Sequence, residues 1–167
     1  MIIIKRDGGI VMGKILMVYA SLSGNTEIVT DIIEGNLQQL GHEVVVKSFD
    51  FDVIEMDELA DYDAVLVGTY TWDDGELPYE AEDFYIELEH ADIEGKIFGA
   101  YGSADSFYDT FGLAIDLMAD RARNLGADVL DERLKIDLMP EADDEERCAN
   151  YAKKISQMIV EKNKVSA

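Results

Sequence analysis

The stretch Ser21-Leu22-Ser23-Gly24-Asn25-Thr26 decides how this chain folds. It follows an apolar run at 15–19 that is typical of a buried parallel strand, and a helical pattern begins near Asn25. The first N–H groups of a helix lack intrahelical partners, and the helix dipole favours negative charge beside them. The three hydroxyl side chains of the stretch add donors, and its glycine lets the backbone approach a ligand closely. The stretch therefore predicts an anion site between a strand and a helix.

The composition of this loop narrows the kind of anion. It contains no lysine and lacks the spacing of a nucleotide-triphosphate P-loop. It also lacks the glycine-rich fingerprint of dinucleotide-binding domains. An uncharged donor loop suits one terminal phosphate held by hydrogen bonds alone. The loop alone leaves a simpler interpretation open, because Asn25 or Thr26 would also serve as an ordinary helix N-cap.

Length and charge limit the classes of protein that remain. The 167 residues suit one domain, and a hydrophobic content of 48% favours a folded chain. The formal net charge is −22, from 36 acidic and 14 basic residues. This charge argues against nucleic acid and anionic membranes as partners. It favours proteins with basic docking faces and, because like-charged surfaces repel, we expect a monomer.

The ends and the rare residues of the chain are equally informative. The single Cys148 excludes an internal disulfide and fits a reducing cytosol, so we expect a cytoplasmic protein. His42 and His90 are isolated and give no metal-ligand spacing, so no metal site is expected. No apolar run reaches transmembrane length. Residues 1–13 are interpreted as an N-terminal extension leading into the first strand, with Met12 as an alternative start, and residues 14–164 as a single domain.

Strand and helix patterns alternate along the chain, which predicts an α/β fold with a parallel sheet covered on both faces. Gly41, Pro78, Gly126 and Pro140 lie at the ends of these patterns, where glycine and proline are typical of helix ends and turns. The acidic segment 50–61 is expected to be a short helix or an irregular crossover. The expected strands are 14–20, 44–49, 64–69, 96–102 and about 128–130 with a further piece at 134–136, and the expected helices are 25–40, 79–89, one ending near 125, and 143–161.

The carboxyl ends of parallel strands meet at one edge of a sheet, and ligands of open α/β sheets bind there. Besides the hydroxyl loop, two unusual loops reach this edge. The loop after the third strand carries Tyr70 and Trp72, and the loop after the fourth carries Phe107 and Tyr108. Two aromatic loops beside a phosphate site suggest a flat ring system held between aromatic faces. The alternative is that Trp72 folds back onto Leu77 or Pro78.

Three segments together resemble the FMN loops of the flavodoxin family: 21–26, Thr71-Trp72, and 102–108 (Gly-Ser-Ala-Asp-Ser-Phe-Tyr). The resemblance covers nearly the whole chain from Lys14 to about Ile159, in the right order and spacing. The absence of a long insertion between Leu130 and Leu134 resembles the short-chain subgroup. The resemblance implies a flavodoxin-like three-layer sandwich with a five-stranded parallel sheet in the order 2-1-3-4-5. It also implies non-covalently bound FMN where the strand order reverses.

The resemblance also assigns roles to individual positions. The phosphate would be held by Ser21, Ser23, Asn25 and Thr26, with Gly24 at the close approach of the backbone. Leu22 offers only its backbone N–H, where other members often have a hydroxyl.

The remaining two loops would hold the sugar-like chain and the ring. Tyr70 and Thr71 would lie beside the ribityl chain, and Trp72 and Tyr108 on the two faces of the isoalloxazine. Backbone groups of Ser103, Ala104 and Asp105 would meet its pyrimidine edge.

Asp73 departs from the family pattern. Many short-chain relatives have glycine there, and its peptide flips to accept a hydrogen bond from flavin N5–H after one-electron reduction. A flipped peptide often needs a positive φ, which an aspartate adopts at a cost of about 1 kcal/mol. We therefore expect Asp73 to weaken stabilisation of the one-electron-reduced state.

The segment from Asp50 to Glu94 contains 17 acidic residues and no lysine or arginine. Carboxylates near the ring disfavour the negative charge of fully reduced FMN, which predicts a low potential for the last reduction. They would also steer the protein to basic partners, in a salt-dependent way. The alternative is a solvated face that confers solubility.

These features predict a low-potential one-electron carrier that shuttles electrons between a reductase and terminal redox enzymes. It would be no enzyme itself, because the chemistry belongs to the flavin. A phosphoacceptor signalling domain is set aside, because Ala20-Ser21 and Thr69-Tyr70 replace the acidic residues that such a domain needs. An FMN-dependent NAD(P)H or quinone oxidoreductase remains the alternative, disfavoured because a Trp72–Tyr108 sandwich would block hydride access.

Overall fold

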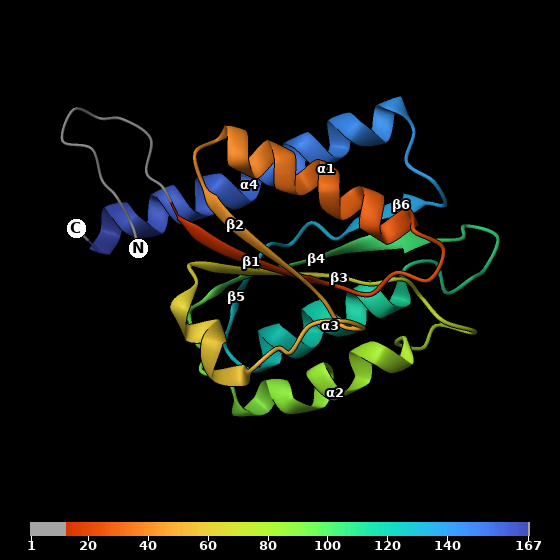
Figure 1. Ribbon diagram of the computed structural model, residues 1–167, viewed down its shortest axis with the longest axis horizontal. Coiled ribbons are helices and arrows are strands. Elements are labelled where there is room, and N and C mark those ends of the chain that lie inside the picture. The colour runs from red at the N-terminus through yellow and green to blue at the C-terminus, as the bar shows by residue number, and fades with distance from the viewer. Residues whose placement is uncertain (1–12, 167) are drawn as a thin grey trace.

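A parallel sheet forms the centre of the molecule in the computed structural model, which describes residues 13–166 (Figure 1). The strand order is β2-β1-β3-β4-β5, and β6 also pairs with β4, so β5 and β6 share the place of the fifth strand. The predicted order 2-1-3-4-5 is thus confirmed. The strands are β1 (Lys14–Tyr19), β2 (Glu43–Ser48), β3 (Ala64–Gly68), β4 (Ile97–Ala104), β5 (Asp128–Val129) and β6 (Leu134–Asp137).

Helices cover both faces of this sheet, as the alternating pattern predicts. Figure 1 shows α1 and α4 on one face and α2 and α3 on the other. The α-helices are α1 (Asn25–Gln39), α2 (Tyr79–Glu87), α3 (Leu113–Asn124) and α4 (Ala142–Ser166), and the 3-10 helices are η1 (Met56–Asp61) and η2 (Leu88–His90).

The strands are apolar on both sides because each face packs against helices. In β1, Ile15 and Met17 belong to the core under α1 and α4, whereas Leu16 and Val18 belong to the core over α2 and α3. All four side chains are fully buried. This explains why the strand has no polar alternation and why the apolar run could be recognised in the sequence.

The register places the ends of the three site-bearing strands side by side. Tyr19 at the end of β1 is paired with Gly68 of β3, and Gly68 is paired in turn with Tyr101 of β4. Because β1 lies between β2 and β3, the chain continues from β1 toward β2 and from β3 in the opposite direction, toward β4. The loops after β1 and β3 therefore diverge at the carboxyl edge of the sheet. The loops after β1, β3 and β4 therefore surround one point.

Some element boundaries differ from the sequence-based expectation. β4 continues to Ala104, so Ser103 and Ala104 belong to a strand instead of a loop. The acidic segment contains η1, which a capping box between Glu55 and Glu58 begins. The helix α4 extends to Ser166 and thus exceeds the expected end at 161.

The predicted N-terminal extension, residues 1–13, lies outside the described residues except for Gly13. Among the residues described, no helix combines the length and the apolar character that crossing a membrane requires. Cys148 is fully buried, and burial raises the pKa of its thiol to about 11.

Candidate functional site

The loop after β1 presents backbone donors at the start of α1. Gly24 is the N-cap residue and adopts a left-handed conformation with φ of 88°. No side chain caps the helix, so the interpretation of Asn25 or Thr26 as an ordinary N-cap is wrong. A glycine adopts this conformation without steric cost, and it has no side chain that could bond the N–H groups of Asn25 and Thr26. This helix end therefore fits an anion.

The hydroxyl groups of the loop have different roles. Ser21 Oγ accepts a hydrogen bond from the Glu27 N–H at 3.3 Å, which leaves the hydroxyl proton available to a ligand. Thr26 is buried, and its Oγ1 lies 2.8 Å from Ser103 Oγ at the end of β4. The Ser103 N–H also donates to Thr26 Oγ1 at 3.4 Å. Thr26 therefore joins the first loop to the third.

A cavity of about 260 Å³ lies between the three loops. Eight of the predicted site residues line it, and three further residues complete it. None of these eleven residues is basic, in agreement with a ligand held without lysine or arginine. The predicted residues are Leu22, Tyr70, Thr71, Trp72, Asp73, Ala104, Asp105 and Tyr108, and the further residues are Thr110, Phe111 and Gly112.

The other predicted residues do not line this cavity. Ser21, Ser23, Gly24, Asn25 and Thr26 form the adjoining loop and helix end, of which Leu22 alone reaches the cavity. Ser103 is buried near the end of β4, where its hydroxyl contacts Thr26. The structure thus separates a cavity lined by aromatic rings from an adjacent set of backbone and hydroxyl donors.

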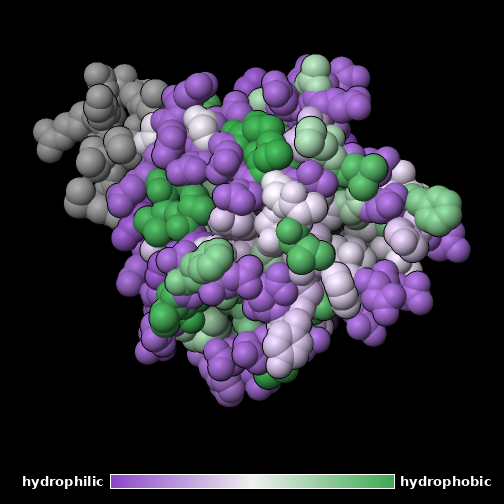
Figure 2. Space-filling model, turned by 45° about the vertical axis from the view of Figure 1, so that its right-hand side comes forward, coloured by the Kyte–Doolittle hydropathy of each residue, from purple (hydrophilic) through white to green (hydrophobic). Residues whose placement is uncertain are grey.

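The two aromatic residues expected to enclose a ring both line the cavity. Trp72 is 49% exposed and Tyr108 is 51% exposed, so each ring has a free area for a ligand. Trp72 contacts Tyr70 edge-on with centroids 6.4 Å apart, and Phe107 contacts Tyr108 in the same way at 5.5 Å. Figure 2 turns this edge forward and shows separate hydrophobic side chains on a mainly hydrophilic surface.

The Trp72 loop is a tight hairpin. Trp72 and Glu76 exchange both backbone hydrogen bonds at 2.8 Å. Asp73 adopts φ of 46° within this turn, a left-handed conformation that is uncommon outside glycine. The backbone around Asp73 is therefore already in the region that glycine adopts most easily.

Neighbouring elements position the second loop. Thr71 Oγ1 accepts a hydrogen bond from the Ala114 N–H at 3.3 Å, which joins this loop to the first turn of α3. The Tyr70 hydroxyl donates to Glu80 of α2 at 2.8 Å. Burial, together with this carboxylate, raises the pKa of Tyr70, which keeps the phenol neutral.

Sequence reasoning missed Thr110, Phe111 and Gly112. These residues directly precede the helix α3, whose start was left undefined, and Gly112 is its N-cap. A glycine immediately before an apolar helical pattern is the signal that was available. Sequence reasoning also missed Asp137, which binds Ser106 of the third loop from β6.

A larger cavity, about 380 Å³, lies at the opposite edge of the sheet, where the strands begin. Charged side chains such as Asp63, Glu94 and Lys96 line it. No residue of the three loops lines this larger cavity. The loop motifs and a cavity therefore occur together only at the carboxyl edge of the sheet.

Comparison with known proteins gives a consistent result. The protein-family model described as Flavodoxin matches residues 17–151. The probable flavodoxin 1 of Bacillus subtilis is 41% identical over 143 residues, which cover 85% of this chain and 89% of that protein. The crystal structure of oxidised flavodoxin 2 from Bacillus cereus superposes with a TM-score of 0.82 at 42% identity, covering 87% of this chain and 99% of that one. A short-chain flavodoxin associated with a non-canonical PDU bacterial microcompartment gives a TM-score of 0.80 at 33% identity, with coverages of 87% and 98%.

Proposed function

This chain belongs to the flavodoxin family, and from that premise we propose which of its residues hold FMN and how they act on it. The chain is an FMN-containing electron carrier and has no enzymatic activity of its own. The observation that carries the assignment of residues is the cavity itself. Trp72 and Tyr108, from two different loops, line it together with Leu22 of the phosphate loop. When bound, FMN supplies the redox chemistry, and the protein supplies orientation and electrostatics.

We assign the phosphate to the loop 21–26. The start of α1, where no N-cap side chain bonds the helix, offers backbone N–H groups, and Ser21 and Ser23 add hydroxyl donors. The Thr26 hydroxyl is already bonded to Ser103, so Thr26 contributes its N–H and the position of the loop. No basic residue is needed for this mode of binding, because the helix end itself favours negative charge.

We assign the isoalloxazine to the cavity, with Trp72 and Tyr108 on its faces. The half-exposed rings of these residues exclude water and provide stacking area. Ala104 and Asp105 line the cavity at the end of β4, where their backbone groups would meet the pyrimidine edge. Tyr70 and Thr71 line the same cavity, and we assign to them the contact with the ribityl chain.

The charges at the cavity determine which redox states the protein favours. Asp73 and Asp105 line it, and both bring negative charge to the region of the ring. Added electrons are therefore disfavoured electrostatically, which lowers the potential of the last reduction. The protein acts as a low-potential donor for this reason.

The partners of the chain are redox proteins. We propose that their docking faces are basic, because the chain carries a net charge of −22. We also propose that the protein acts as a monomer in the cytoplasm. Mutual repulsion of acidic surfaces supports the monomer, and a single buried cysteine supports the cytoplasmic location.

An anaerobic reductive titration of the purified protein, followed by its visible spectrum, tests this function. We expect yellow protein and two separated one-electron steps, the second at much lower potential. Direct two-electron bleaching with turnover on NAD(P)H would instead assign the chain to the oxidoreductases. A colourless protein that takes up no FMN would overturn the assignment of all three loops.

A further inference from the structure

We propose that β6 holds both ends of the loop 105–112, here called the flavin-ring loop, through Asp137 and Lys135, and that these two are positioning residues for the isoalloxazine. This inference rests on the assignment of the cavity to FMN. Five residues of the loop line that cavity, among them Tyr108. Neither Asp137 nor Lys135 lines it, so both would act through the loop they hold.

Asp137 holds the beginning of the loop. Its Oδ1 accepts the Ser106 N–H at 3.0 Å, and its Oδ2 accepts the Ser106 hydroxyl at 2.6 Å. The next residue, Leu138, donates its N–H to the Ala104 carbonyl at 2.8 Å. Donation from Ser106 lowers the pKa of Asp137, because both bonds favour the ionised carboxylate. Three bonds thus join the end of β6 to the start of the loop.

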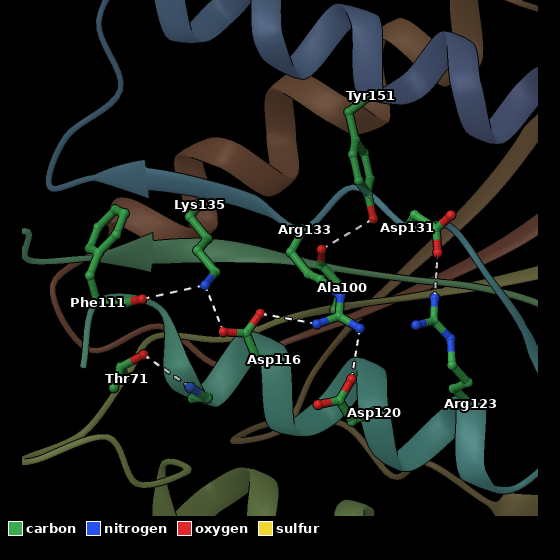
Figure 3. A network of polar contacts seen from close by, with 11 residues as sticks. Thr71, Ala100, Phe111, Asp116, Asp120, Arg123, Asp131, Arg133, Lys135 and Tyr151 are labelled. Carbon is green, nitrogen blue, oxygen red and sulfur yellow. Dashed lines mark hydrogen bonds and ion pairs between the residues drawn. The ribbon is translucent and has the colours of Figure 1, made fainter. Parts of the chain in front are cut away.

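Lys135 holds the other end of the loop. Its Nζ donates to the Phe111 carbonyl at 3.4 Å and to Asp116 Oδ2 of α3 at 2.6 Å, as Figure 3 shows. Its stem passes Gly112 so closely that a Cβ at this position would lie 2.5 Å from Lys135 Cδ. Gly112 also has φ of 68°, so both the lack of space and the backbone conformation favour glycine at this position.

The ion pairs around Asp116 fix the orientation of Lys135. Arg133, also close to β6, donates to Asp116 Oδ1 at 3.2 Å and to Asp120 at 2.7 Å (Figure 3). Asp116 is thus shared between Arg133 and Lys135, and the first two turns of α3 are held against β6. A network of this kind restricts side chains more than an isolated surface ion pair does.

The strand itself supplies a rigid base. Lys135 and Asp137 are two residues apart, so they project from the same face of β6. Leu134 and Ile136 project from the other face and are buried in the core under α1 and α4. In addition, β6 pairs with β4 in register, with Asp137 beside Ala104. The flavin-ring loop begins at the end of β4, with which β6 is paired, and it ends at the start of α3, to which Lys135 of β6 is bonded.

The test compares variants of Asp137 with a matched control. Asp137→Ala removes both acceptors, whereas Asp137→Asn removes the charge but keeps an oxygen for the Ser106 N–H. Asp131→Ala is the control, because it removes an exposed carboxylate bonded to Arg123 at 2.6 Å. Asp131 lies toward the far end of α3 in Figure 3. FMN and riboflavin affinities, the visible circular dichroism of the bound flavin and urea unfolding of the FMN-free protein are measured for each.

We expect Asp137→Ala to weaken FMN binding about tenfold, because both hydrogen bonds to Ser106 are lost. Riboflavin should lose a similar factor, since the loop contacts the ring and not the phosphate, and the circular dichroism should change. Asp137→Asn should remain within about twofold of the parent, and Asp131→Ala should match it. Lys135→Met, which keeps the stem against Gly112, should weaken binding about threefold, because its bond to Phe111 is long.

The proposal is overturned if Asp137→Ala binds FMN as tightly as Asp131→Ala does. It is also overturned if Asp137→Asn loses as much affinity as Asp137→Ala, because charge alone would then be the cause. A loss confined to FMN would place the effect at the phosphate, and a matching loss of FMN-free stability would make the role purely structural; either result overturns it. Failure of the unmodified protein to bind FMN would instead refute the proposed function.

Discussion

The hydroxyl groups of Thr26 and Ser103 lie 2.8 Å apart, although 77 positions separate the two residues in the chain. Thr26 lies in the first turn of α1 at the proposed phosphate loop, and Ser103 is the penultimate residue of β4, beside the proposed ring site. Thr30 extends the contact, because its hydroxyl donates to the Thr26 carbonyl at 2.8 Å and lies 2.7 Å from the Tyr101 hydroxyl. Both side chains of the pair are buried, so the two loops are joined within the core.

Removal of this contact should weaken FMN binding. Ser103→Ala leaves the buried Thr26 hydroxyl with only the long 3.4 Å bond from the backbone N–H of residue 103, and we expect a loss of about 1 kcal/mol in FMN-free stability and a severalfold loss of FMN affinity. Ser156→Ala is the matched control, because Ser156 bonds His42 at 2.7 Å far from the cavity. It should lose stability but keep FMN affinity, measured by flavin fluorescence titration. Equal affinities for the two variants would contradict the coupling.

Asp73→Gly should raise the maximum fraction of one-electron-reduced protein. Asp73 already has φ of 46°, so the increase depends on any further backbone change that the peptide flip on reduction requires, which glycine makes without the cost of about 1 kcal/mol that a side chain adds. The control is Asp74→Gly, which removes a carboxylate from the same hairpin at a residue with no positive φ. A redox titration followed by visible absorption measures both. If Asp74→Gly produces the same increase, charge and not backbone conformation is responsible.

Trp72→Ala should weaken FMN binding by about tenfold or more, because one stacking face of the proposed ring site is lost. The fluorescence of the remaining bound flavin should rise, since contact with the indole quenches it. Phe107→Ala serves as the control, because Phe107 is 85% exposed and does not line the cavity. Fluorescence titration with FMN gives both quantities. An unchanged affinity for Trp72→Ala would move the ring out of this cavity.

The layers and the location of the site could be predicted because they depend on local patterns. The alternation of Ile15, Leu16, Met17 and Val18 between two faces requires only that both faces of the strand be covered. The meeting of three loops at one edge follows from the parallel direction of the strands alone. Eight of the residues that the resemblance assigns to FMN line one cavity at this edge, and their contacts with FMN remain a prediction.

Contacts that depend on register could not be predicted. Asp137 meets Ser106, 31 positions away, only because β6 pairs with β4 at Ala104. The sequence indicates two separate extended pieces here, but no local pattern shows at which residue of β4 the second piece pairs. In the same way, Thr26 turns its hydroxyl to Ser103 because the end of β4 lies against the start of α1. The sequence showed the hydroxyl and not its direction.

The acidic segment predicts a dependence of electron transfer on salt. The rate from the reduced protein to a basic acceptor such as cytochrome c should fall as ionic strength rises, because the attraction is screened. The pair Asp74→Asn and Glu76→Gln, in the exposed Trp72 hairpin, should flatten this dependence. Replacing Asp143 and Glu145 of α4 by their amides provides an equal change of charge on another element. Equal flattening by both pairs would show that net charge alone governs the encounter.

His42 predicts a specific pH dependence of stability. Its Nδ1 accepts the Gly13 N–H at 3.0 Å, and its Nε2 lies 2.7 Å from Ser156 Oγ, so the neutral ring fits this site. Burial lowers the pKa of His42 in the folded state, and the nearby Asp63 opposes this only in part. An unfolded histidine titrates near 6.5, so as pH falls through about 6.5 the unfolded chain binds a proton first. The free energy of unfolding should therefore decrease from about pH 6.5 down to the lower pKa of the folded state, and should be constant above this window.

Urea unfolding of the FMN-free protein between about pH 5 and 8 measures this effect, with a limiting slope of about 1.4 kcal/mol per pH unit. His42→Gln should remove this part of the dependence, because glutamine does not titrate. His90→Gln should retain it, because His90 has an exposed side chain. Carboxylates that titrate at lower pH affect all three proteins alike, so the difference between the two variants isolates His42. Parallel curves for His42→Gln and the parent would show that the ring is protonated as readily in the fold as outside it.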